Sequence, residues 1–367
     1  MISAGSARNR EFGRYRAASA VLLAGGGAYA GAFVPNAPAI FLVVPLMLFA
    51  LSDGVMQRIG ISVAAHSALW SPLPGMAMAY GLSPTEAWVG VLTLMFAQAI
   101  VVGLLPPFFG VSLWAASPFG FGHPLFGVFS VLPFQLLGEL AGVCAAVAIL
   151  ASLAIRRTTA ATLVCLIALW IISVLDADTP SPSVIEPVPT AFGERSLFPV
   201  EDWAAIGVKL AQRTASGPVL LPEATIGQDA ERGHEFFSRL AQSHDRDLLV
   251  GVSAPSGEEV VRFFSDGRVA TVHRQVQGVP LINDDVAWPW QFLASHVEVH
   301  GERVSFAICY EAFLPMTWVR ALMARSTTVA VVSNDRWSAS VVKAAQAKLL
   351  SFPWPTTIVL AANVPEE

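Results

Sequence analysis

Charged residues are scarce in this chain. Of its 367 residues only 13% are Asp, Glu, Lys or Arg, whereas 54% are hydrophobic. Soluble domains carry about 25% charged residues. The scarcity therefore excludes an ordinary soluble protein and indicates a part that lies in a membrane. The net charge of −5 offers no basic surface, so we expect no nucleic-acid partner.

Lysine and arginine are missing altogether between Arg58 and Arg156. At about 20 residues per spanning helix, that stretch has room for about three crossings or more. We expect residues 1–16 to be a basic amino-terminal segment and residues 17–175 to hold about seven transmembrane helices. The candidate spans are Ala17–Val34, Ala37–Val55, Ile61–Tyr80, Thr85–Leu105, Phe108–Phe121, Val131–Ile155 and Thr159–Leu175.

The first apolar segment, Ala17–Val34, has two interpretations. It follows a basic start, as the core of a signal peptide does, but several more apolar segments come after it, which favours a retained span. With seven spans, the arginines near the amino terminus, at Arg58 and at Arg156 all lie on the cytoplasmic side. Everything after residue 176 is then outside the cytoplasm. This count depends on Phe108–Phe121, which is short and rich in Gly and Pro.

Cysteine is also scarce, and its three positions exclude a disulfide framework. Cys144 and Cys165 lie in apolar segments. Cys309, in contrast, ends the β-like segment Val304–Ile308. A strand that breaks into a turn in this way presents a nucleophile at the carboxyl edge of a sheet, where backbone amides stabilise an oxyanion. The alternative is a core cysteine at the end of a strand.

The composition changes at a Pro- and Ser-containing linker, residues 176–189, and residues 190–367 then follow an α/β pattern. We expect helices at Val200–Arg213, Asp229–Ser243 and Ser340–Ser351. We expect strands at Pro218–Leu221, Asp247–Val252, Glu259–Ser265, Arg268–Arg274, His296–His300, Val304–Ile308, Thr327–Ser333 and Thr357–Ala361. Alternating strands and helices predict a layered α/β domain.

Three ordered motifs resemble the nitrilase superfamily of carbon–nitrogen hydrolases. Ala307–Glu311 resembles the family's nucleophile elbow, Val219–Ala224 resembles its Leu-Pro-Glu segment, and Val331–Trp337 resembles a turn of the membrane-bound apolipoprotein N-acyltransferases. The resemblance implies a multi-span α-helical membrane domain followed by an α-β-β-α sandwich, shortened at the carboxyl end. It implies no cofactor and no metal.

The same resemblance assigns roles to individual residues. Cys309 would be the nucleophile and Glu223 its base, since a thiol needs help to ionise near neutral pH. The alternative for Glu223 is to cap the helix after Pro222. Glu311, Tyr310 and Asn334 would lie beside these two residues. Tyr310, with Trp337, would line an acyl-binding wall or simply belong to the core.

The family's lysine is missing. The chain has three lysines, Lys209, Lys343 and Lys348, and none lies between the predicted base and nucleophile. Within the corresponding segment, Val272–Pro280, Arg274 or Gln275 takes its place. We expect Arg274 to be the third catalytic residue, because a guanidinium stabilises an oxyanion although it does not readily transfer protons.

This departure, with Trp288–Trp290 downstream, resembles the TraB proteins of plasmid conjugation. That resemblance implies a multi-pass protein of the bacterial inner membrane whose carboxyl-terminal domain is periplasmic. One hypothesis is a Cys-dependent acyltransferase or amidase with a lipid acyl donor. The other is a non-catalytic module that binds membrane lipids and conjugation or envelope proteins.

A metal site is a separate alternative. His296, Glu298 and His300 would share one face of a strand, a geometry that can bind a metal. A solvated hairpin face is the commoner arrangement, and we expect no metal.

Overall fold

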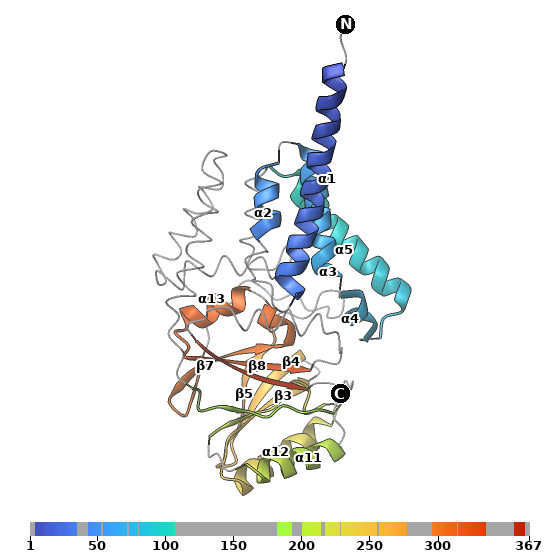
Figure 1. The fold of residues 1–367 in the computed structure, drawn as a ribbon. Coiled ribbons are helices and arrows are strands. Elements are labelled where there is room, and N and C mark those ends of the chain that lie inside the picture. The colour runs from blue at the N-terminus through green and yellow to red at the C-terminus, as the bar shows by residue number, and fades with distance from the viewer. Residues whose placement is uncertain are drawn as a thin grey trace. The chain divides into compact units, whose positions relative to one another are not determined.

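The computed structural model describes thirteen stretches of the chain. They are residues 4–34, 43–52, 54–71, 73–79, 81–106, 182–192, 200–213, 217–227, 229–254, 257–276, 296–313, 315–334 and 356–363. The described residues up to 106 belong to one compact unit, and those from 182 onward belong to a second (Figure 1).

The first unit is helical. Its helices are α1 (Ala4–Phe33), α2 (Val43–Ala50), α3 (Val55–Trp70), α4 (Leu73–Ala79) and α5 (Pro84–Leu104). Helix α3 packs against both α1 and α5. A Cβ atom added to Gly103 of α5 would lie 2.7 Å from the Cα atom of Ile59 of α3. Glycine at this position therefore lets the two backbones approach closely, as in packed membrane helices.

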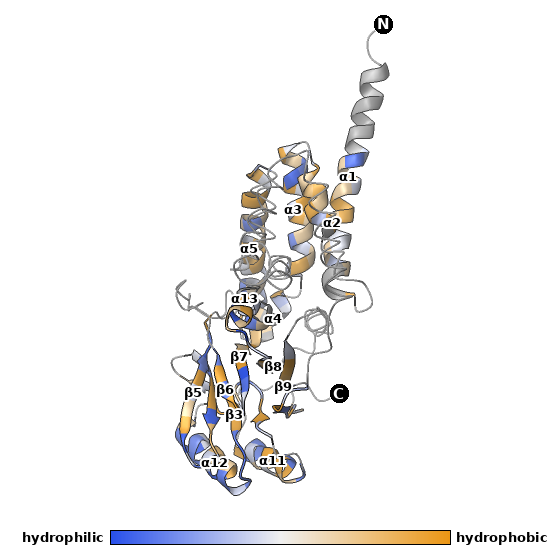
Figure 2. Cartoon of the chain, turned by 90° about the vertical axis from the view of Figure 1, so that its left-hand side faces the viewer, coloured by the Kyte–Doolittle hydropathy of each residue, from blue (hydrophilic) through white to orange (hydrophobic). Residues whose placement is uncertain are grey.

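Helix α5 has apolar side chains on all sides. Ala87, Val91 and Ala99 are buried, whereas Trp88 and Phe96 are exposed. At about 1.5 Å per residue its 21 residues extend about 31 Å, close to the thickness of a bilayer core. Among the described residues, α5 is the one helix that is long and apolar enough to cross a membrane. Figure 2 shows few hydrophilic residues on it.

The expected spans compare unevenly with these helices. Thr85–Leu105 matches α5, and Ala17–Val34 lies largely within α1. The expected span Ile61–Tyr80 is divided between α3 and α4. Pro74, in the first turn of α4, has no N–H group to continue the hydrogen bonds of α3. The last three expected spans lie outside the described residues, so the multi-span arrangement stays a prediction.

The second unit contains two sheets. The first has the order β1-β2-β3-β4-β5, formed by β1 (Glu186–Pro187), β2 (Val219–Leu220), β3 (Leu248–Ala254), β4 (Gly257–Phe263) and β5 (Val269–Arg274). The second has the order β6-β7-β8-β9, formed by β6 (Val297–Val299), β7 (Glu302–Ile308), β8 (Thr328–Asn334) and β9 (Thr357–Asn363). Strands β1, β2 and β3 are parallel, as are β7, β8 and β9.

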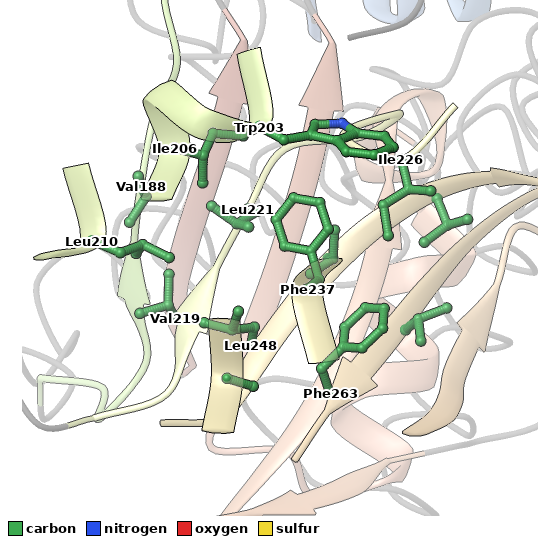
Figure 3. Packing of buried hydrophobic residues seen from close by; sticks show 14 residues of the cluster. Val188, Trp203, Ile206, Leu210, Val219, Leu221, Ile226, Phe237, Leu248 and Phe263 are labelled. Carbon is green, nitrogen blue, oxygen red and sulfur yellow. The ribbon is translucent and has the colours of Figure 1, made fainter. Parts of the chain in front are cut away.

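Alternating side chains pack each face of the first sheet. Leu248 and Val250 of β3 join a core with helices α11 (Val200–Ala211) and α12 (Ala230–Ser243). Figure 3 shows the aromatic part of this core, in which Phe237 lies between Trp203 and Phe263. The intervening residue of β3, Leu249, packs on the opposite face, against side chains of β7, β8 and β9. The two sheets therefore form a sandwich.

The predicted helices and strands of the described part are confirmed, with shifts of a few residues at their ends. The expected linker differs, because its second half belongs to the sandwich. Glu186–Pro187 pairs with β2, and Ile185 is buried between the sheets. Ser183 and Val184 donate hydrogen bonds to Glu302 of β7. The expected helix at Ser340–Ser351 lies outside the described residues.

Candidate active site

The nucleophile candidate ends strand β7 in a strained turn. Cys309 has a φ of +47° and is 6% exposed, and it begins the 3-10 helix Cys309–Phe313. A buried residue other than glycine rarely adopts this left-handed conformation, and such strain is concentrated at functional sites. The structure thus confirms the predicted elbow.

The base candidate comes from the other sheet, where it follows strand β2. The Glu223 carboxylate is 8% exposed and accepts a hydrogen bond of 2.9 Å from the backbone N–H of Asn334. Asn334 ends β8, two residues beyond the Val332 that pairs with Ile308 of β7. Since neighbouring strands lie about 4.8 Å apart, this bond holds Glu223 near the end of β7 that carries Cys309.

The backbone around Glu223 is tightly positioned. Ala224 adopts a left-handed φ of 55°. A Cβ atom added to Gly251 of β3 would lie 2.5 Å from the Glu223 Cα atom, so only glycine permits this approach. Asn334 is fixed in turn, because its side-chain carbonyl accepts a bond of 3.0 Å from Asn363 of β9. Asn334 therefore lies against Glu223, and its place in a catalytic site stays a prediction.

Glu311 joins the two sheets behind the elbow. Its carboxylate accepts hydrogen bonds from the backbone N–H groups of Ile308 (3.0 Å) and Val276 (2.6 Å), and lies 2.8 Å from His273 Nε2. Burial by itself raises the pKa of Glu311, but His273, the Arg320 cation and the Val276 N–H outweigh burial and hold this pKa below its usual value. Glu311 is therefore an ionised positioning group, and Glu223 remains the candidate base.

Arg274 does not join these residues. Its guanidinium is 67% exposed and pairs with Glu259 of β4 at 2.8 Å. The reason is a bulge in β5: His273 pairs with Val260 and Thr271 with Val261, which leaves Val272 as an extra residue. Val272 and the next residue therefore both face the second sheet. The bulge turns Arg274 toward the face that carries the helices.

Among the described residues of this segment, His273 and Gln275 bring polar side chains to β7. The His273 ring, 7% exposed, stacks on Phe306 with the ring centroids 6.3 Å apart. The side-chain amide of Gln275 donates a hydrogen bond of 3.4 Å to the carbonyl oxygen of Ile308. Sequence reasoning left Gln275 as an alternative and missed His273, because nothing in the sequence marks the bulge.

The remaining candidates are placed as follows. The Tyr310 backbone lies in the turn after Cys309, while its side chain and Trp337 are outside the described residues. The alternative metal site is not formed, since His300 contacts Asp247 and His296 contacts Arg303. Within the described stretches, no three His, Cys, Asp or Glu side chains group as metal ligands.

Comparison with known proteins gives matches among solved structures alone. No protein-family model and no curated protein matches the chain. An amidase from Nesterenkonia sp. is 16% identical over 49% of this chain and 74% of its own, with a TM-score of 0.39. A carbon–nitrogen hydrolase from Helicobacter pylori G27 is 14% identical over 50% and 73%, also with a TM-score of 0.39.

A CN-hydrolase superfamily protein from Xanthomonas campestris, with an arsenic adduct in its active site, is similar to the same extent. It is 16% identical over 49% of this chain and 75% of its own, with a TM-score of 0.39. Each of these three similarities covers about half of this chain.

Proposed function

We propose that this protein is a thiol-dependent acyltransferase or amidase whose reaction takes place in the second unit. One observation carries the proposal: Cys309 stands strained and buried at the end of β7, and the buried Glu223 is bonded to the end of the neighbouring strand β8. Parallel strands that end at one edge are a common place for such residues, because turns there can hold reactive groups rigidly.

The chemistry needs no additional reagent. Glu223 takes the proton of the Cys309 thiol as the sulfur attacks an ester or amide carbonyl, and a carbon–sulfur bond forms. The resulting oxyanion collapses and expels the alcohol or amine, which receives the proton from Glu223. Water or an acceptor amine then attacks the thioester, gives its proton to Glu223 and releases the thiolate, which regains that proton. Glu311 keeps the elbow in place throughout.

The helices of the first unit would hold this enzyme at a membrane. The support is the length and apolar surface of α5, the scarcity of charge in the first half of the chain, and the close packing of α3 with its neighbours. We propose a multi-pass protein of the bacterial inner membrane, with the second unit in the periplasm and a membrane lipid as acyl donor.

A second candidate function is a non-catalytic binding module. It is favoured by the absence of lysine from residues 224–308 and by the exposed position of Arg274. In this form of the proposal the protein resembles the TraB conjugal-transfer proteins and binds conjugation or envelope partners, with its chemistry reduced or lost.

The test is intact-mass analysis of the detergent-extracted full chain after incubation with phospholipid vesicles. The enzyme proposal predicts an acyl adduct that hydroxylamine removes and that Cys309→Ala abolishes. Glu223→Ala should also lack it, while the exposed control Glu235→Ala should retain it. An unmodified wild-type chain under these conditions would favour the binding module.

A further inference from the structure

The bulge in β5 selects the side chains that reach the nucleophile. It directs Arg274 away and turns His273 and Gln275 toward β7. His273 is already engaged, since its Nε2 lies against the Glu311 carboxylate and its ring stacks on Phe306. Among the described residues of this segment, 272–276, Gln275 is therefore the side chain with a donor left over for a substrate.

The position of Gln275 is fixed from both sides. The residue two before it, His273, and the residue after it, Val276, both bond the Glu311 carboxylate. Its own backbone N–H donates to Glu258 at 2.8 Å. A half-buried side chain on so constrained a backbone loses little further freedom when it binds a reacting group.

The amide group itself is suited to bind an oxyanion. One N–H of Gln275 faces the carbonyl of Ile308, the residue before Cys309. A primary amide carries a second N–H, about 120° from the first. No group among the described residues takes this donor, which can therefore serve an atom bound to the nucleophile. Asn and Gln amides are among the groups that stabilise oxyanions in acyl transfer.

We infer that Gln275 is a catalytic residue that donates a hydrogen bond to the oxyanion formed on attack by Cys309. His273 acts through Glu311 as a positioning residue. This inference rests on the proposed enzymatic function. It assigns a neutral donor to the place where the resemblance puts a lysine, and it explains how the chain can act without that lysine.

The test compares two reactions of Cys309 in the full chain. Acylation by 4-nitrophenyl acetate passes through an oxyanion, whereas alkylation by iodoacetamide displaces iodide and forms none. Gln275→Leu removes the donor and keeps the size of the side chain. We expect its acylation rate constant to fall about 100- to 1000-fold, with alkylation within twofold of wild type. Gln275→Lys, which restores a donor, should recover most of the acylation rate.

Any other result would overturn either the role of Gln275 or the proposed enzymatic function. Equal losses in acylation and alkylation would make Gln275 a structural residue. Unchanged acylation in Gln275→Leu, or an equally large loss in Arg274→Leu, would overturn the inference and leave the Cys309–Glu223 reaction intact. A wild-type chain that is alkylated at Cys309 but never acylated would instead overturn the proposed enzymatic function, and this inference with it.

Discussion

Residues with a left-handed backbone conformation, in which φ is positive, occur at both edges of the sandwich but have different roles there. In the described part of the chain, five residues other than glycine have a positive φ. Asp245, His300 and Arg325 lie in exposed turns at the edge where the parallel strands begin. Ala224 and Cys309 are buried at the edge where those strands end. Exposed turns reverse the chain, whereas the buried pair holds Glu223 and the thiol in place.

The buried charges differ in the same way. At the first edge, Arg262 of β4 donates to Asp247 at 2.9 Å and to the carbonyl of Glu298 at 2.8 Å, and so ties the sheets together. At the second edge, Glu223 and Glu311 accept bonds from backbone N–H groups at the ends of β8 and β7, and no arginine bonds either carboxylate directly among the described residues. Under the proposed function, the first edge supplies stability and the second supplies reactivity.

The largest expected effect is on the rate of Cys309 acylation, which should respond to a change at one edge and not at the other. Glu223→Gln removes the base and should slow acylation of Cys309 by about 10²- to 10⁴-fold. Asp247→Asn, at the other edge, should leave the rate within threefold at a temperature where both variants are folded. Single-turnover kinetics with 4-nitrophenyl acetate measure both. Similar losses in the two variants would abolish the distinction between the edges.

The next effect separates the edges by stability. Asp247→Asn leaves the buried Arg262 without its counter-charge and should cost about 3–5 kcal/mol in the free energy of unfolding. The exposed Arg268–Asp266 pair is the matched control, and Asp266→Asn should show no measurable loss. Thermal unfolding of the detergent-extracted protein compares them. Equal stabilities of the two variants would contradict the structural role of Asp247.

A smaller effect concerns the loss of stability at acidic pH. Burial raises the pKa of Asp247, but the Ser265 N–H and Arg262 outweigh it, and the pKa lies below its usual value. The stabilisation from Asp247, as from Glu311, is thus complete above the unfolded-state pKa of about 4 and is lost as pH falls through the lower folded-state pKa.

Glu311→Gln should therefore make the free energy of unfolding depend less on pH below about pH 4. At neutral pH it should lower that free energy by about 1–3 kcal/mol. Glu311→Gln should also slow acylation, since the Ile308 N–H loses its charged acceptor. Asp247→Asn should make stability less dependent on acid in the same way but should leave the acylation rate unchanged. Denaturation curves at several pH values check this. An acid transition as steep as that of wild type would contradict the assignment of Glu311.

The smallest effect tests the strained residues directly. Glycine accepts a positive φ, so Asp245→Gly should change the unfolding free energy by less than about 1 kcal/mol and leave acylation unchanged. Ala224→Gly relieves similar strain but loosens the residue next to Glu223, so acylation should fall several-fold. If Ala224→Gly kept the full rate, the left-handed residue would have no part in holding the base.

Much of this site could be predicted from sequence because its motifs are local. A strand that ends in Cys309, Glu223 after Leu-Pro, and Asn334 at the end of an apolar strand can each be recognised within a few residues. Parallel strands then bring their ends together. The choice between Arg274 and Gln275 in place of the lysine could not be made in this way. Strict alternation from Val272 would turn Arg274 inward, and the extra residue of the bulge reverses that direction.

Two other differences have the same kind of cause. The pairing of Glu186–Pro187 with β2 is too short to give a periodic pattern, so the segment was predicted to be linker. The division of Ile61–Tyr80 into α3 and α4 involves Pro74, whose effect hydrophobicity alone does not show. Long, regular segments such as α5 and β7 were predicted well.

The most direct test of the central claim is the rate at which iodoacetamide alkylates Cys309 between pH 5 and 9. The protein would carry Cys144→Ala and Cys165→Ala, so that one thiol remains, and would be compared with the same protein bearing Glu223→Gln. We predict that at pH 6 the protein that keeps Glu223 is alkylated at least about tenfold faster than the protein with Glu223→Gln, because the carboxylate accepts the thiol proton. Identical rates at every pH would show that Glu223 and Cys309 do not work together, and would contradict the account.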